Sequence, residues 1–188
     1  DRSKNWVPWD YSYNLLQSCA PNSVLFTNGD NDTFPLWYLQ DVEGVRRDVK
    51  VANLSLLNTE WYIKQLKNND PYKVGTVRMR LSNEQIEQLR PIQWAAKNLT
   101  ILPPQPSSTV SFNDIAQQYG IKDTTVLKQG ALNWTMNPTL NYGNVKAVRV
   151  QDLMVKEIVE SNNWERPIYF AVTCSEDSKI GLSNYLRM

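Results

Sequence analysis

Residues 23–37, SVLFTNGDNDTFPLW, join a short apolar run, a polar turn and a helix start without a break. The run from Ser23 to Thr27 is apolar and β-branched, which is typical of a buried strand. The turn after it ends at Thr33, a favoured helix N-cap residue, and Pro35 fits a first helical turn, where a missing N–H costs nothing. This stretch therefore predicts a strand–loop–helix unit, whose helix closes near Gly44.

The same unit occurs again along the chain. A second apolar strand is predicted over 49–57 and a helix over 61–67, while a third strand over 167–173 follows a helix from 150 to about 162. A further helix over 9–19 precedes the first strand. Repetition of strand, loop and helix favours a parallel sheet with right-handed crossovers. We therefore predict an α/β fold, a Rossmann-like three-layer domain with a mainly parallel central sheet.

The middle of the chain, about 72–148, is predicted to be an irregular insertion in this core. It contains an alternating segment over 73–81 that predicts an edge strand, a capping box at Ser82 that opens a short helix, a strand over 98–101 and a helix over 111–119 closed by Gly120. The domain prediction is one α/β domain over 1–188, with core segments 9–67 and 149–185. Because the first residues carry neither an initiator Met nor an apolar signal core, we expect a piece of a longer protein.

Composition excludes several functional classes. With 20 basic and 19 acidic residues the net charge is +1, so no global field attracts nucleic acid, and we expect no nucleic-acid partner. The chain has no histidine, which removes the commonest general base and the usual zinc ligand. Two distant cysteines, Cys19 and Cys174, leave buried free thiols and one long-range disulfide as alternatives.

Polar side chains follow each of the three predicted core strands. In open parallel sheets ligands bind beyond the carboxyl ends of the strands, where helix N-termini also point. The predicted ligand-binding residues at this edge are Asn28, Asp30, Asp32, Thr33, Trp37, Asn58, Thr59, Glu176 and Asp177. Such oxygen-rich residues suit sugar hydroxyls or a hard divalent cation, for which Asp30 and Asp32 are the candidate ligands.

A structural interpretation of the same residues remains open. Asp30 and Asp32 can instead satisfy backbone N–H groups of a tight turn, and Glu176 and Asp177 can simply be solvated. The Asp30-Asn31-Asp32 run matches a D-x-D pattern of some nucleotide-sugar transferases, but this pattern is common by chance. No glycine-rich phosphate loop is present, and no catalytic residue is assigned. Of the seven tryptophans, Trp37, Trp61 and Trp134 are the candidates for stacking on a ligand.

Two stretches carry a family resemblance. The first is 9–66, with the run NGDNDTFPLWYLQ at 28–40, and the second is 149–187, with RVQDLM at 149–154 and RPIYFAVT at 166–173. They resemble the soluble part of a large bacterial family of multi-pass membrane proteins similar to protein O-mannosyltransferases, grouped as glycosyltransferase family 117. The resemblance implies a glycosyltransferase-C type membrane region on the same polypeptide as partner, and an extracytoplasmic, periplasmic location tethered to the membrane. It places the catalytic acidic residue of the parent protein, a mannosyltransferase-like enzyme, outside this chain.

The resulting hypothesis is that this domain of unknown function is a non-catalytic accessory domain of a membrane glycosyltransferase-like protein. It would bind an acceptor protein, a glycan or a donor head group at the carboxyl edge of the sheet. Two alternatives stay open. One is a metal-dependent enzyme site on Asp30 and Asp32 with the Glu176/Asp177 loop, which would need a divalent cation as cofactor. The other is a purely structural spacer.

Overall fold

The computed structural model describes residues 5–103, 105–106, 108–118 and 131–186. The helices of this described part are α1 Val7–Ser18, α2 Gly29–Asp41, α3 Glu60–Asn68, α4 Asn83–Glu87, α5 Phe112–Gln118 and α7 Val150–Ser161. Its strands are β1 Val24–Thr27, β2 Lys50–Asn53, β3 Ile92–Gln93, β4 Lys97–Ile101, β5 Leu132–Met136, β6 Leu140–Tyr142, β7 Val145–Val148 and β8 Ile168–Phe170. Three 3-10 turns complete the set: η1 Leu56–Asn58, η2 Asp177–Lys179 and η3 Ser183–Tyr185. Each described helix is too short or too polar to cross a membrane.

The fold is mixed α/β with three small sheets, so the prediction of a Rossmann-like domain with a mainly parallel central sheet is wrong. One sheet is parallel, in the order β2-β1-β8, and the other two, β3-β7-β6 and β4-β5, are antiparallel. The physical reason lies in the middle of the chain, where the strands pair with one another in antiparallel ladders and add nothing to the parallel sheet. Only the parallel sheet joins strands from both ends of the sequence.

The three predicted core strands do lie side by side and point the same way. Val24 of the central strand β1 is opposite Lys50 of β2 on one side and Ile168 of β8 on the other. The strand β1 is completely buried, and Phe26 stacks on Phe170 with ring centroids 4.8 Å apart. The carboxyl ends of three neighbouring strands therefore share one edge, as the sequence predicts.

Several element boundaries differ from the predictions for local reasons. The strand predicted over 49–57 ends at Asn53, because the Asn53 carboxamide oxygen accepts a hydrogen bond from the Leu56 N–H (3.1 Å) and starts η1. Residues 73–81 form no strand, since polar groups there bond to side chains and loops, as when the Ser161 hydroxyl donates to the Arg78 carbonyl (2.7 Å). The capping box at Ser82 is confirmed and opens α4. The predicted helix end at residues 119 and 120 lies outside the described residues.

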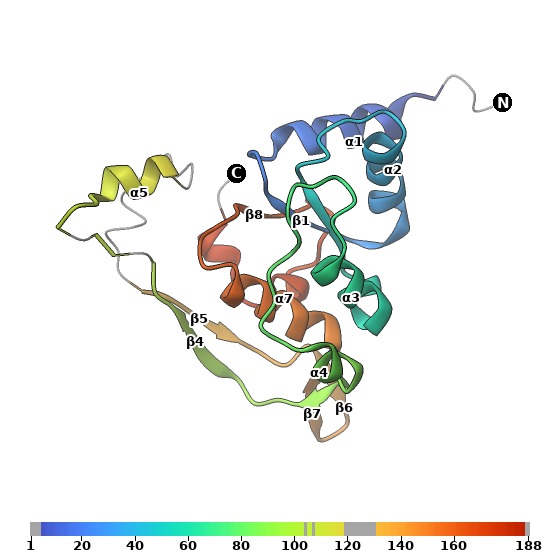
Figure 1. Cartoon of the computed structure of the whole chain (residues 1–188). Coiled ribbons are helices and arrows are strands. Elements are labelled where there is room, and N and C mark those ends of the chain that lie inside the picture. The colour runs from blue at the N-terminus through green and yellow to red at the C-terminus, as the bar shows by residue number, and fades with distance from the viewer. Residues whose placement is uncertain (1–4, 104, 107, 119–130, 187–188) are drawn as a thin grey trace.

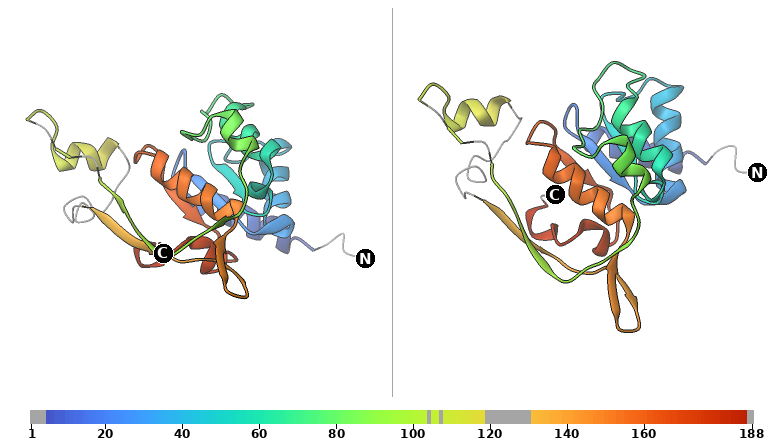
Figure 2. Two further views of the ribbon diagram at one scale, coloured as in Figure 1. Left: turned by 90° about the horizontal axis from the view of Figure 1, so that it is seen from below. Right: turned by 60° about the horizontal axis from the view of Figure 1, so that its bottom comes forward.

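Figure 1 shows where the insertion lies relative to the core. The β4–β5 ribbon runs away from the parallel sheet, and α5 lies at its far end, well apart from β1 (Figure 1). Both views of Figure 2 place α7 between this ribbon and the N-terminal half of the chain, and both show the β6–β7 hairpin projecting from the body. The insertion therefore leaves the outer edge of β2 uncovered by any of the described strands.

Arg46 fixes the end of α1 against the entrance to β2. Its guanidinium donates to the carbonyls of Leu16 (2.8 Å), Cys19 (3.0 Å) and Ala20 (3.1 Å), at and just beyond the end of the helix. The same group forms a two-pronged pair with Asp48, with both N–O distances 2.9 Å. This pairing holds the pKa of Asp48 below its usual range, because the Arg46 hydrogen bonds favour the charged carboxylate.

Candidate functional site

Thr33 lies at the centre of a group of hydrogen bonds at the carboxyl ends of β1 and β2. Its hydroxyl donates to the Gly29 carbonyl (2.6 Å) and accepts from the Asn53 carboxamide (3.0 Å), and it shares a third hydrogen bond with the Thr27 hydroxyl (2.7 Å). A hydroxyl offers one proton and two lone pairs, so these three partners use its full capacity. Thr33 is completely buried and has no hydrogen-bonding capacity left for a ligand.

Asp32, the residue before Thr33, closes the same turn. Its carboxylate accepts hydrogen bonds from the Asn28 N–H (3.2 Å) and from the Thr173 hydroxyl, and the residue is only 6% exposed. The Asn28 carboxamide in turn donates to the Thr173 carbonyl (3.3 Å). The turn after β1 is therefore tied to the segment after β8, and the structure does bring Asn28, Asp32 and Thr33 together.

The helix start differs from the prediction at this point. The helix α2 begins at Gly29, with Asn28 as its N-cap residue, and Thr33 lies inside it. The Thr33 hydroxyl donates back to the Gly29 carbonyl, whereas an N-cap hydroxyl would accept from a later backbone N–H, so Thr33 does not act as the cap. Asp30 and Asp32 thus lie in the first helical turn, where negative charge is favoured by the helix dipole.

The other predicted ligand residues have partners of their own. Asn58 accepts from the Gln151 N–H (3.0 Å) and donates to the Gln151 side chain (2.9 Å), so it caps the start of α7. The Thr59 hydroxyl donates to the Leu56 carbonyl (2.7 Å). Glu176 pairs with Lys179 and accepts from Ser183, and the Lys179 contact lowers the pKa of Glu176. Asp177 is exposed in η2.

Neither a metal cluster nor an activated thiol forms at this edge. In the described part of the chain, His, Cys, Asp and Glu residues never gather in a group of three or more that could hold an ion. Cys174 and Cys19 are both buried and free. Burial, with the Asp32 charge adding to it, raises the pKa of the Cys174 thiol to about 11, so that thiol is protonated at neutral pH.

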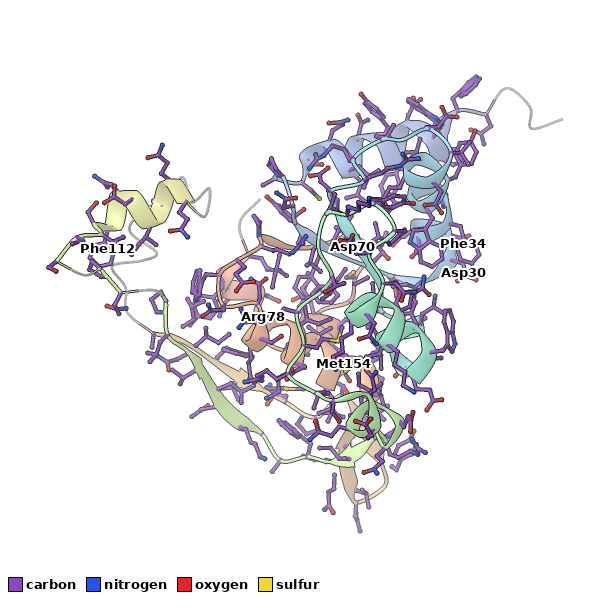
Figure 3. All side chains as sticks on the ribbon, in the orientation of Figure 1. Asp30, Phe34, Asp70, Arg78, Phe112 and Met154 are labelled. Carbon is purple, nitrogen blue, oxygen red and sulfur yellow. The ribbon has the colours of Figure 1, made fainter. Side chains whose placement is uncertain are left out.

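A groove lies along the outer edge of β2, between α2 and α3. Its volume is about 800 Å³, and two of the predicted stacking residues, Trp37 of α2 and Trp61 of α3, line it. The loop after α3 also lines it, with Asp70 among the lining residues (Figure 3). The third candidate, Trp134, is buried in β5 and is not part of this groove.

Four aromatic rings form a continuous row beside the groove. Ring centroids are 5.6 Å apart for Phe34 and Trp37, 6.2 Å for Trp37 and Tyr62, and 5.6 Å for Tyr62 and Trp61. Tyr62 anchors the row, because its buried hydroxyl donates to the Val51 carbonyl (3.1 Å) and accepts from the Asn53 N–H (3.0 Å). Burial raises the pKa of Tyr62 to about 12, so the phenol keeps its proton.

Comparison with known proteins assigns the family. The family model described as TMEM260-associated domain 2 matches residues 8–142 and 105–188 of the chain. The chain belongs to this family. Membership in TMEM260-associated domain 2 confirms the predicted resemblance to O-mannosyltransferase-like membrane proteins.

A curated relative of this TMEM260-associated domain is Protein O-mannosyl-transferase TMEM260 from Mus musculus. The two are 30% identical over 71 residues, which is 38% of this chain and 10% of the mouse protein. The aligned stretch thus covers about a tenth of that relative. No solved structure matches the chain.

Sequence reasoning predicted part of this candidate site and missed the rest. Thr27, Asn53 and Thr173 belong to the hydrogen bonds around Thr33 and Asp32 but were not predicted as site residues. Each was assigned to a strand, Thr27 and Thr173 at its last position and Asn53 in its interior. The groove residues Tyr62 and Asp70 were also missed. The tryptophan content was the signal that pointed to Trp37 and Trp61, although nothing in their spacing indicated that they line one groove.

Proposed function

We propose that this chain is a non-catalytic accessory domain of a membrane glycosyltransferase-like protein, and that it binds an acceptor protein, a glycan or a donor head group. Membership in the TMEM260-associated domain 2 family supports the first part. We place the domain on the extracytoplasmic side, tethered to the membrane region of the same polypeptide. Protease treatment of the full-length protein in sealed vesicles tests this placement. Cleavage of the domain only from the cytoplasmic side would contradict it.

One observation carries the binding role: two exposed or half-buried tryptophans line a groove of about 800 Å³ at the edge of the parallel sheet. Pockets of this size accommodate small-molecule ligands, and tryptophan is enriched where an apolar face must also meet water. The other lining residues come from α2, β2, α3 and the loops after both helices, so the strand-end residues Asn28, Asp30 and Thr59 lie outside the groove lining. The buried Asp32 and Thr33 hold the turn at the start of α2, the helix that carries Trp37.

Binding of the purified chain tests the proposal. Acceptor polypeptides, free oligosaccharides and a sugar phosphate are titrated separately against the wild type and Trp37→Ala, with sugar transfer assayed in parallel. We expect at least one ligand class to bind, Trp37→Ala to weaken it by about 10-fold, a loss equivalent to 1.4 kcal/mol, and no transfer by the chain alone. Binding by none of the three classes, or transfer by the isolated chain, refutes the proposal.

The metal-dependent alternative has its own test. A cation that binds only the folded chain stabilises it by mass action and so raises the melting temperature. At a free cation concentration 100 times the dissociation constant, the added stability is about 2.7 kcal/mol. Calcium, magnesium and manganese are titrated with the wild type and with Asp30→Asn. A shift that disappears in Asp30→Asn would favour the metal site over the accessory role. The spacer alternative predicts no response to cations and none to the three ligand classes.

A further inference from the structure

The side chains that line the groove between α2 and α3 favour one class of ligand over the others. This inference rests on the proposed binding function. Trp61 presents its indole to solvent with 55% of the residue exposed, while its contact with Tyr62 fixes the orientation of the ring. The Tyr62 hydroxyl donates to one backbone group of β2 and accepts from another, so the Tyr62 ring that supports Trp61 is held rigidly. A fixed, exposed indole face suits a flat apolar surface, such as the C–H face of a pyranose ring.

An extended peptide does not fit along the edge of β2. Strand addition requires free backbone groups on that edge. Here the Val49 carbonyl accepts from the Gln40 carboxamide (2.7 Å), and Tyr62 occupies both the Val51 carbonyl and the Asn53 N–H. Side chains of α2 and α3 therefore already occupy three of the outward backbone groups of β2, which interrupts the ladder that an incoming strand would form.

A phosphate-bearing ligand also lacks a partner in the groove. Among the described lining residues, the two cations are Arg47 and Lys50, and both are engaged. Lys50 pairs with Asp70 at 3.2 Å, and Arg47 donates to the carbonyls of Gln40 (2.7 Å) and Asp41 (3.0 Å). The Arg47 guanidinium also lies over the Tyr72 ring, 5.0 Å from its centroid. Tight recognition of a phosphate uses a two-pronged or clustered set of N–H donors. Lys50 is paired with Asp70, and Arg47 directs its Nε and Nη2 donors to two carbonyls, so the described lining offers no such cluster.

Neutral hydrogen-bonding groups remain on the groove wall formed by α3. The side-chain amides of Gln65 and Asn69 line the groove and are exposed, and within the described part of the chain neither amide has a hydrogen-bond partner. A carboxamide both donates and accepts, which matches hydroxyl groups that do the same. The opposite charges of Asp70 and Lys50 cancel close to these amides.

We propose that the groove between α2 and α3 binds a neutral oligosaccharide, with one pyranose ring stacked on Trp61 and neighbouring hydroxyls bonded to Gln65 and Asn69. The ligand class is thus an uncharged glycan, either free or carried by an acceptor. A phosphorylated sugar or a bare polypeptide segment is not the ligand of this groove.

The test compares three probes by two-dimensional NMR of the labelled chain: mannotriose, mannose 1-phosphate and an unglycosylated peptide. We expect mannotriose to shift the Trp61 indole N–H signal, and Trp61→Ala to weaken binding about 10-fold or more. Gln65→Ala and Asn69→Ala should each weaken it severalfold. The matched control is Trp6→Ala, because Trp6 is similarly exposed (64%) but lies at the start of α1, outside the groove.

The outcomes separate this inference from the proposed function. Binding of the phosphate or the peptide at Trp61, with mannotriose silent, refutes the neutral-glycan assignment and leaves the accessory binding role standing. Mannotriose binding that responds to Trp6→Ala and not to Trp61→Ala also refutes the assignment, because the site then lies elsewhere. If no probe binds the wild type, both proposals are refuted.

Discussion

Replacing Thr33 by valine preserves the volume of the side chain and removes one buried hydroxyl from the strand-end turn. The Thr27 hydroxyl and the Asn53 carboxamide, both completely buried, then lose a partner. An unsatisfied buried polar group costs about 1–3 kcal/mol, and two such groups with partial relaxation give about 2–4 kcal/mol of lost stability. For a chain of this size, this corresponds to a fall of roughly 4–16 °C in melting temperature.

Urea unfolding followed by tryptophan fluorescence measures this loss as a lower midpoint with an unchanged slope. Thr33→Ser is the matched control, because it keeps the hydroxyl and should lose only about 1 kcal/mol for the missing methyl group. Asp30→Ala removes an exposed side chain of the same turn and should change stability by no more than about 0.5 kcal/mol. If Thr33→Val were as stable as Asp30→Ala, the hydroxyl would not be the structural centre of the turn, and a ligand role for Thr33 would regain support.

Three further changes test other parts of the structure. Asn58→Ala should cost about 1–2 kcal/mol in urea unfolding because the Gln151 N–H in the first turn of α7 loses its partner, and it should leave ligand affinity unchanged; weaker binding at full stability would contradict this structural role. The pKa of Asp48 is depressed, so its stabilising effect is complete above the unfolded value of about 3.9 and is lost as pH falls through the folded value. Asp48→Asn should therefore flatten the loss of stability below about pH 4, and an unchanged pH profile would rule out this contribution. Gly181→Ala should cost more than Gly143→Ala, since both have positive φ but only at Gly181 would the new Cβ approach a backbone atom, the Thr135 carbonyl oxygen, at 2.3 Å; equal melting temperatures would contradict the steric argument.

Local signals in the sequence predicted the elements of the parallel sheet well. The apolar runs of β1 and β8 and the capping box of α4 were all found, because each depends on contacts within a few residues. The sheet architecture was not predicted, because antiparallel pairing within the insertion depends on contacts such as Lys97 with Met136, far apart in sequence. The repeated strand–loop–helix pattern indicated parallel neighbours correctly, but it could not indicate how few strands the sheet would have.

The candidate site was predicted only in part, and Asp30 and Asp32 illustrate the physical reason. If Thr33 were the N-cap of the helix, as expected, both carboxylates would lie in a loop and could face one crevice. Because α2 begins at Gly29, the two residues lie about 200° apart around the helix axis at 3.6 residues per turn. Asp32 therefore turns inward to Asn28 and Thr173, whereas Asp30 lies on the outward side of the helix with Phe34 (Figure 3). A shift of five residues in the N-cap, from Thr33 to Asn28, thus decides which carboxylate supports the fold and which one a ligand can reach.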